Sequence, residues 1–366
     1  MKSLARRPPA AGRQSGTEHY PFVSLVIPCR NEGAMVARVM ESLLEQDYPA
    51  EHLELLFVDG QSTDETRAVV AGYAGRQPHP AIRLISNPDI TTPHAFNIGI
   101  RVARGSIIFT LGAHTCYSRG YVSGVVMELI ESGADAVGSV AVTEPGADSL
   151  VAQAIARALS CRFGVGGSLM RIGVSQPREA DTASCPGYRR EVFDRIGLFN
   201  AELARNQDIE FNLRLRRAGG RIVVDPRITS SYRARASLSA LARNSFGNGY
   251  WVVRGTKVSR LPFSLRHLAP FGLVSALILT LVAGAFWRPA LVGAAALLGA
   301  YAAADVCAAI AAARGRWRLV PALLVAFPVL HLSYGFGSLS ALGTLWRGDP
   351  RPGPGLHSRK VVAGER

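Results

Sequence analysis

The first third of the chain alternates between short apolar runs and amphipathic stretches. Four runs rich in β-branched and other apolar residues predict buried strands, at residues 22–28, 53–58, 82–86 and 106–111. Apolar residues three and four positions apart predict the helices between them, at residues 34–44, 65–74 and 92–103. Strands that alternate with helices are typical of an α/β domain with a doubly wound, mostly parallel sheet.

The next part of the chain continues this pattern less regularly. Small apolar side chains predict a strand within residues 134–145 and a helix at 149–159. A polar loop at 181–190 leads into a short helical pattern, and another helical pattern begins near Asp208. The amphipathic stretch 239–253, rich in Arg and aromatic residues, predicts the last helix of this region.

Three long apolar runs follow, at about residues 268–287, 289–312 and 319–346. They are long enough to cross a bilayer, so we expect two or three transmembrane helices. Arg residues between the second and third runs indicate a cytosolic loop. The basic tail after the third run indicates the cytosolic side as well, and Pro328 interrupts that run. Whether the third run crosses the membrane therefore stays open.

These patterns divide the chain into four parts. We expect a disordered tail, an α/β domain, a membrane region and a basic tail, at residues 1–20, 21–255, 256–346 and 347–366. The first part is rich in Arg, Pro, Gly and Ser and lacks the apolar core of a signal peptide. The expected location is the cell membrane, as a multi-pass protein with the α/β domain in the cytosol.

Composition narrows the classes of partner. The formal net charge is +14, which suits nucleic acid, anionic lipid or an anionic substrate. The sequence has no basic run interleaved with aromatic residues, so we do not expect nucleic acid. Its five cysteines are widely spread and form no C-x-x-C pair, which argues against a disulfide framework or a zinc site.

Polar side chains follow three of the four first predicted strands. Glu32 follows the first strand, Asp59 the second and His114 the fourth. Ligands of open α/β sheets bind outside the carboxyl ends of the strands, so these residues are candidates for a site. The first loop has no G-x-G-x-x-G and the chain has no G-x-x-x-x-G-K-[ST], which excludes the usual dinucleotide and P-loop motifs.

An acidic pair begins the helical pattern near residue 208. Asp208 and Glu210 are two positions apart, so on a helix their side chains point about 200° apart and cannot act together on one atom. One of them can face a cleft as a base while the other faces solvent or an Arg. Acidic residues at a helix N-terminus also favour the helix dipole in any protein.

Several segments resemble motifs of the family 2 glycosyltransferases with the GT-A fold. They stand in the family's order and spacing, at residues 24–32, 58–66, 95–99, 187–190 and 206–219. The C-terminal apolar runs and the stretch 112–117 are similar to those of succinoglycan-type exopolysaccharide glucosyltransferases. The resemblance implies a GT-A nucleotide-sugar domain followed by transmembrane helices.

The resemblance also implies a role for each matching residue. Asp208 would be the catalytic general base of an inverting enzyme. The donor would be held by Pro28, Arg30, Glu32, Asp59, Asn97, Gly112 and His114. The acceptor or diphosphate side would comprise Gly187, Tyr188, Arg189, Gln207, Arg243 and Trp251. Carboxylates suit the donor side because ribose hydroxyls and the uracil N–H donate hydrogen bonds.

One position departs from the family pattern. The D-x-D motif, which binds Mg²⁺ or Mn²⁺ with the donor diphosphate, corresponds here to residues 112–114. Gly112 replaces the first carboxylate, and the imidazole of His114 suits Mn²⁺ better than Mg²⁺. A metal could bind through His114 and another acid, Arg residues could replace it, or activity could be low or lost. We expect a metal-assisted enzyme.

The sequence thus predicts a membrane-anchored, inverting glycosyltransferase. It would move a sugar from a nucleotide donor, with UDP expected, to a lipid-linked saccharide or glycan acceptor in cell-surface polysaccharide synthesis. Other polysaccharide-assembly proteins could be further partners. The alternative is a non-catalytic membrane protein that binds nucleotide sugars. The sequence does not specify the sugar, the acceptor, the linkage or the oligomeric state.

Overall fold

The structure is a computed structural model that describes residues 20–76, 79–259 and 264–346. Its strands are β1 (Val23–Cys29), β2 (Leu53–Asp59), β3 (Ala81–Ser86), β4 (Ile107–Thr110), β5 (Ala136–Glu144), β6 (Arg178–Glu179), β7 (Ser184–Arg189) and β8 (Ile222–Arg233). Its α-helices are α1 (Gly33–Leu44), α2 (Thr66–Ala74), α3 (Thr92–Val102), α4 (Tyr121–Ser132), α5 (Leu150–Ala158), α6 (Arg162–Val165), α7 (Leu169–Ile172), α8 (Arg190–Ile196), α9 (Gln207–Arg217), α10 (Leu238–Ser259), α11 (Ala269–Gly284), α12 (Pro289–Ala313) and α13 (Val320–Trp346). The two predicted tails lie outside the described residues, apart from residue 20.

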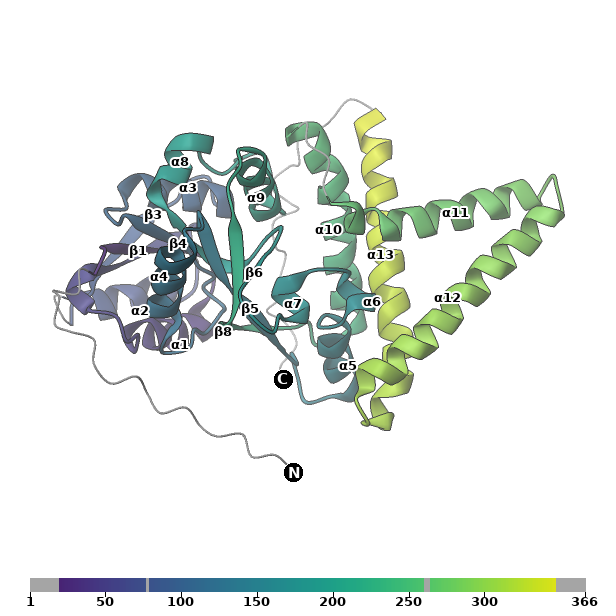
Figure 1. The fold of residues 1–366 in the computed structure, drawn as a ribbon, viewed down its shortest axis with the longest axis horizontal. Helices are drawn as coiled ribbons and strands as arrows, with labels where there is room; N and C mark the ends of the chain where they lie inside the picture. Colours follow the sequence, from purple (N-terminus) through teal and green to yellow (C-terminus); the bar gives the residue numbers. More distant parts are fainter. Residues whose placement is uncertain (1–19, 77–78, 260–263, 347–366) are drawn as a thin grey trace.

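An eight-stranded sheet organises the α/β domain in the order β3-β2-β1-β4-β7-β5-β8-β6 (Figure 1). Strands β3, β2, β1 and β4 are parallel to one another, and β5 is parallel to β8. Strand β7 runs antiparallel to β4 and β5, and β6 runs antiparallel to β8. The predicted mixed, mostly parallel sheet is confirmed.

Alternate residues of β1 face two separate hydrophobic clusters, as the period of a strand requires. Leu25 and Ile27 are buried on the face covered by α1 and α4. Val26 is buried on the other face, against α3, α8 and α9. Because both faces are covered, the strand reads as a continuous apolar run in the sequence.

The sequence prediction missed the elements α4, α6, α7, β6 and β7. Helix α4 buries one apolar face on the sheet, and β7 occupies residues that were expected to form a loop. Strand β8 continues past the apolar run that ends at Val224 and reaches Arg233. Its register against β5 shifts between Asp225 and Thr229, and Pro226 in this shift disguises the continuation.

The C-terminal helices form two groups. Helices α10 and α13 lie side by side, whereas α11 and α12 project away from them as a hairpin (Figure 1). Helix α12 and the segment Trp317–Leu345 are long and apolar enough to cross a membrane, and α11 is shorter. Helix α13 continues through Pro328. The domain boundary expected near residue 255 falls inside α10 and stays a prediction.

Candidate functional site

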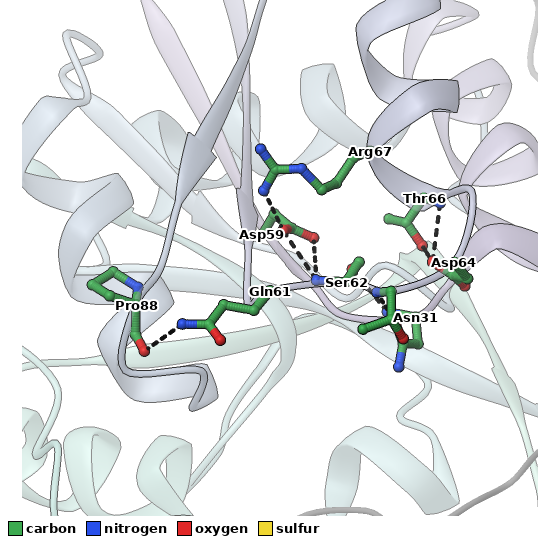
Figure 2. Close-up of polar contacts among 9 residues, drawn as sticks. Asn31, Asp59, Gln61, Ser62, Asp64, Thr66, Arg67 and Pro88 are labelled. Atoms are coloured by element: carbon green, nitrogen blue, oxygen red, sulfur yellow. Dashed lines mark hydrogen bonds and ion pairs between the residues drawn. The ribbon is translucent and has the colours of Figure 1, made fainter.

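The loops after β1 and β2 are joined by backbone-to-side-chain hydrogen bonds (Figure 2). The bonds run from Asn31 N–H to Ser62 Oγ (2.9 Å), from Glu32 N–H to Thr66 Oγ1 (2.8 Å), from Gly33 N–H to Asp64 Oδ2 (3.0 Å) and from Thr63 N–H to Asn31 Oδ1 (2.8 Å). Helix α1 has no side-chain cap at its own N-cap residue. The second loop therefore caps the first helix, which fixes the two loops relative to each other.

Asp59 lies at the base of these loops. Its fully buried carboxylate accepts hydrogen bonds from the Ser62 N–H and, at 2.8 Å, from Nη1 of Arg67 (Figure 2). A buried carboxylate requires such partners because burial alone disfavours its charge. Asp59 thus shapes the loop that was expected to hold the donor, and its oxygens do not face solvent.

Glu32 and His114 are brought together across the carboxyl edge of the sheet. Nδ1 of His114 lies 3.7 Å from Oε1 of Glu32, and both side chains keep access to solvent. These residues follow β1 and β4, which are neighbouring parallel strands. Their convergence agrees with the expectation that strand-end residues form one site.

The end of β4 is tied to the beginning of β7. The Tyr117 hydroxyl accepts from the Gly112 N–H at 2.8 Å and lies 3.1 Å from the Gly112 carbonyl oxygen. It also lies 3.6 Å from Sγ of Cys185. Burial raises the pKa of the Cys185 thiol, so this cysteine is neutral at ordinary pH and packs rather than reacts.

The described residues near Gly112 do not form a metal site by themselves. Glu32 and His114 offer two ligands, and nowhere in the described part of the chain do three His, Cys, Asp or Glu side chains gather closely enough to hold a metal ion. A Cβ at Gly112 would stand 3.3 Å from Oγ1 of Thr115 and 3.6 Å from Cε1 of His114. The missing carboxylate would therefore point towards the Glu32–His114 pair.

Asp208 stands at the start of α9, where it interacts electrostatically with Cys185, Tyr188 and Arg171. Its side chain keeps access to solvent although protein atoms surround it closely. Desolvation raises the pKa of its carboxyl, while backbone hydrogen bonds at the helix start and the charge of Arg171 oppose the rise. A carboxylate with a raised pKa is a better proton acceptor than an ordinary one.

Glu210 has a different environment. Its buried carboxylate accepts from Nε of Arg214 at 2.7 Å and from Nη2 at 3.0 Å. Arg214 also donates to the carbonyl oxygens of Ile196 and Leu198, so the pair holds α9 against the loop after α8. The expectation that one acid of the pair faces an Arg is confirmed.

Four predicted site residues serve the packing of the domain instead. The side-chain amide of Asn97 is buried, and both its nitrogen and its oxygen bond the backbone of Phe199. The hydroxyl of buried Tyr188 lies 2.8 Å from Oδ1 of Asn212. Gly187 lies inside the sheet, and Arg189 donates to carbonyl oxygens at the end of α4.

The acceptor-side loop expected at 187–189 is therefore corrected to strand. Strand β7 is antiparallel to β4, so its first residues lie at the carboxyl edge of β4 and its last residues at the opposite edge. Cys185, which the sequence prediction did not include, lies near Asp208, as Tyr188 of the same strand does.

The remaining predicted site residues differ in their exposure to solvent. Pro28 is half-buried in β1 and Arg30 is exposed just after it. Gln207 is half-buried at the first position of α9. On α10, Arg243 is exposed and Trp251 is buried beneath the guanidinium of Arg254.

Backbone strain gathers at the carboxyl edge of the sheet. The described non-glycine residues with positive φ include Asn31, Gln61, Ile90, Cys185 and Asn206. The first three follow β1, β2 and β3, Cys185 interacts electrostatically with Asp208, and Asn206 precedes Asp208 by two residues. Such conformations persist where surrounding structure fixes them, and they cluster at functional sites.

A recess lies elsewhere on the α/β domain. It has a volume of about 390 Å³ and is bordered by α7, β8 and the segment 264–266. Four of its charged residues are paired with each other, Arg221 with Glu179 and Arg266 with Asp181. The strand-end cluster is therefore the better candidate for the chemistry.

Comparison with known proteins identifies the enzyme class. Residues 24–197 match the model of glycosyl transferase family 2. The chain carries a family 2 glycosyltransferase domain. This match includes Glu32, Asp59 and His114 and ends before Asp208. The predicted enzyme class, a glycosyltransferase, is confirmed.

Relatives of this glycosyltransferase cover most of its length. The succinoglycan biosynthesis protein ExoA of Rhizobium meliloti is 28% identical over 316 residues, which is 86% of this chain and 92% of that protein. A dolichyl N-acetyl-alpha-D-glucosaminyl phosphate 3-beta-D-2,3-diacetamido-2,3-dideoxy-beta-D-glucuronosyltransferase of Methanococcus voltae is 26% identical over 267 residues, 72% of this chain and 82% of that protein.

A solved structure supports the fold. The mannosyltransferase PcManGT from Pyrobaculum calidifontis, in complex with GDP-Man and Mn²⁺, has a TM-score of 0.59 and 21% identity. The match covers 91% of this chain and 89% of that one. The shared GT-A fold therefore extends beyond the residues that the family model matches.

Proposed function

We propose that the protein is a membrane-anchored, inverting glycosyltransferase in which Asp208 is the general base. It moves a sugar from a nucleotide donor, with UDP as the expected nucleotide, to a hydroxyl of a lipid-linked or polysaccharide acceptor. The observation that carries this proposal is the position of Asp208, which is accessible at the start of α9 and near the tied ends of β4 and β7.

The chemistry needs one proton acceptor. Ionised Asp208 takes the proton of the acceptor hydroxyl as that oxygen attacks the anomeric carbon. The bond from this carbon to the donor diphosphate breaks on the opposite face, so the configuration inverts. The raised pKa of Asp208 strengthens it as a base.

The donor side is supported by the loop network. Glu32 is accessible beside His114 and can accept hydrogen bonds from ribose hydroxyls. Asp59 contributes indirectly, because its hydrogen bonds to Ser62 and Arg67 fix the conformation of the loop after β2. We assign no step to a metal ion because Glu32 and His114 are the two ligands that the described residues near Gly112 offer.

The membrane anchor is supported by exposed apolar surface and by charge. Phe286 and Trp287, between α11 and α12, are 90% and 65% exposed, and apolar side chains on both helices are exposed as well. Such a surface is costly in water and suits lipid. At the other end of α12, Arg314 and Arg316 lie near Arg157 of α5. This basic group is typical of a cytosolic interface, which supports a catalytic domain on the cytosolic side.

The acceptor class is supported by the relatives. One is named for transfer to a dolichyl-phosphate-linked sugar and another for succinoglycan biosynthesis. A domain held at the bilayer reaches lipid-linked substrates directly, because its cleft lies where they reside.

The first test is the variant Asp208→Asn in a transfer assay with labelled UDP-sugars and lipid extracts as acceptors. We expect kcat to fall about 10²- to 10⁴-fold while UDP affinity stays within about twofold, because the amide cannot take the proton. Asp194→Asn, which changes an exposed Asp on α8, is the matched control. Unchanged transfer by Asp208→Asn contradicts the base assignment. Nucleotide binding without transfer by the unaltered protein, across a panel of acceptors, contradicts the enzyme proposal.

A further inference from the structure

Three guanidinium groups gather on the α10 side of Asp208. They belong to Arg171 on α7, Arg205 just before α9 and Arg235 just after β8. Nη1 of Arg205 and Nη2 of Arg235 both donate to Oδ1 of Asn244, at 3.3 and 3.4 Å. We call Arg171, Arg205 and Arg235 the arginine cluster.

Tyr232 connects the members of the arginine cluster. The guanidinium carbon of Arg171 lies 4.4 Å from the centre of the Tyr232 ring. Tyr232 also interacts electrostatically with Arg205. Asn248 accepts a second bond from Arg205 at 3.3 Å, and Asn206 donates to the Asn248 carbonyl oxygen at 3.2 Å. Residues from four elements thus hold the guanidinium groups in place.

The arginine cluster has no carboxylate in direct ion-pair contact, although Asp208 interacts electrostatically with Arg171. Within the described residues, none of its three members forms an ion pair, and the buried Nη1 of Arg171 has no hydrogen-bond partner. Desolvation and the nearby charge of Arg235 both lower the pKa of Arg205. Like charges held together by neutral amides are unfavourable unless an anion joins them.

We propose that Arg171, Arg205 and Arg235 form a binding site for a diphosphate ester beside Asp208. The guanidinium fork matches phosphate oxygens with two parallel hydrogen bonds, and three forks match a group with several such oxygens. Asn244 orients two of the forks. This inference rests on the proposed function, in which both substrates carry phosphate groups.

Two substrates could supply the diphosphate: the nucleotide donor and a prenyl-diphosphate-linked acceptor. The arginine cluster borders β8 and α10, whereas the donor loops follow β1 and β2 in the other half of the sheet. Helix α10 packs along α13, whose apolar segment is long enough to cross a membrane (Figure 1). This placement favours the acceptor as the source.

The test measures binding by the full-length protein in detergent micelles. UDP and farnesyl diphosphate are the probes, and uridine is the probe without phosphate. The variants are Arg171→Gln, Arg205→Gln and Arg235→Gln. Arg217→Gln, which removes an exposed charge at the far end of α9, is the matched control. Calorimetry gives the affinities, and the thermal midpoint without ligand reports folding.

We expect each variant to weaken one diphosphate probe roughly 10- to 100-fold, because each removes charged hydrogen bonds to phosphate. Uridine binding and the Arg217→Gln control should stay within about twofold. Weaker farnesyl diphosphate binding assigns the acceptor as the source, and weaker UDP binding assigns the donor. The unliganded midpoint should hold or rise, because each substitution relieves repulsion.

Three results would overturn the inference. They are wild-type affinities for both probes in all variants, no binding of either probe by the wild type, and a lower unliganded midpoint that accounts for the lost binding. The test distinguishes a failure of this inference from a failure of the proposed function. Arginine-dependent binding without any transfer would contradict that function alone, and transfer by variants with normal diphosphate affinity would contradict the arginine cluster alone.

Discussion

The loops after β1 and β2 and the arginine cluster are both polar, but their hydrogen bonding differs. In the two loops, side-chain oxygens accept the N–H groups of the facing loop, and Asp59 is paired with Arg67. In the arginine cluster, two guanidinium groups share one amide oxygen and a third has a buried nitrogen without a partner.

This difference distinguishes polar groups that stabilise the fold of this enzyme from polar groups that can bind a ligand. Polar groups that satisfy one another stabilise the fold, and their loss costs stability. Charged groups held together without a counter-charge add little to stability and keep their capacity for a ligand. Substitutions in paired regions should therefore lower stability first, and substitutions in the arginine cluster should lower affinity first.

The largest effect on stability is expected at Glu210. Its carboxylate forms an ion pair with Arg214, as the carboxylate of Asp59 does with Arg67. Glu210→Ala leaves the guanidinium of Arg214 without its carboxylate in a mostly buried place, so the free energy of unfolding should fall by about 3 kcal/mol. Urea denaturation followed by circular dichroism measures this change. A loss below about 1 kcal/mol would show that the pairing does not support α9.

Asp64→Ala tests the loop network and should cost about 1–2 kcal/mol, because it removes acceptors for Gly33 N–H and for the Thr66 N–H and hydroxyl. Desolvation raises the pKa of Asp64, but hydrogen bonds from Thr66 and Gly33 outweigh it, and the net pKa is lowered. A lowered pKa means that this stabilisation is present above the ordinary pKa and is lost as pH falls through the lowered one.

The measurement for Asp64 is the denaturation midpoint of both proteins as a function of pH. The difference between Asp64→Ala and the wild type should be constant near neutral pH and shrink below about pH 4. Asp47→Ala, whose exposed side chain caps no helix in the described loops, is the control. A gap that is unchanged down to pH 2 would contradict the role of the ionised carboxylate.

Much of the fold follows from local pattern. Strands β1, β2 and β4 were predictable because each is a largely apolar run buried on both faces, whereas β3 is an edge strand with a partly exposed apolar pattern. The different environments of Asp208 and Glu210 were predictable because helical geometry separates their side chains. Strand β7 was not, since Pro186 and Gly187 mark turns in most sequences. Here a Cβ at Gly187 would lie 2.8 Å from Val125, so close packing requires glycine inside a strand.

The arginine cluster could not be predicted from sequence. Its members lie on three separate elements, and each is one of 41 basic residues in the chain. Only the tertiary structure brings Arg171 and Arg205 to Tyr232, brings Arg205 and Arg235 to Asn244, and shows that none of the three forms a direct ion pair within the described residues. The position of Cys185 near Asp208 could not be predicted from the sequence either, because it depends on the direction of β7.

The smallest effect is expected on the pH dependence of kcat/KM in variants of Arg171, the member of the arginine cluster that interacts with Asp208. Its charge lowers the pKa of Asp208, which desolvation raises. Arg171→Gln removes the opposing charge, so the pKa of Asp208 rises further, and the acidic limb of log(kcat/KM) against pH should move to higher pH. The added loss at the acidic end should stay below about tenfold. Arg171→Lys keeps the charge and should keep the wild-type limb, even if both variants bind diphosphate more weakly. The same limb in both variants would mean that Arg171 does not act on the base.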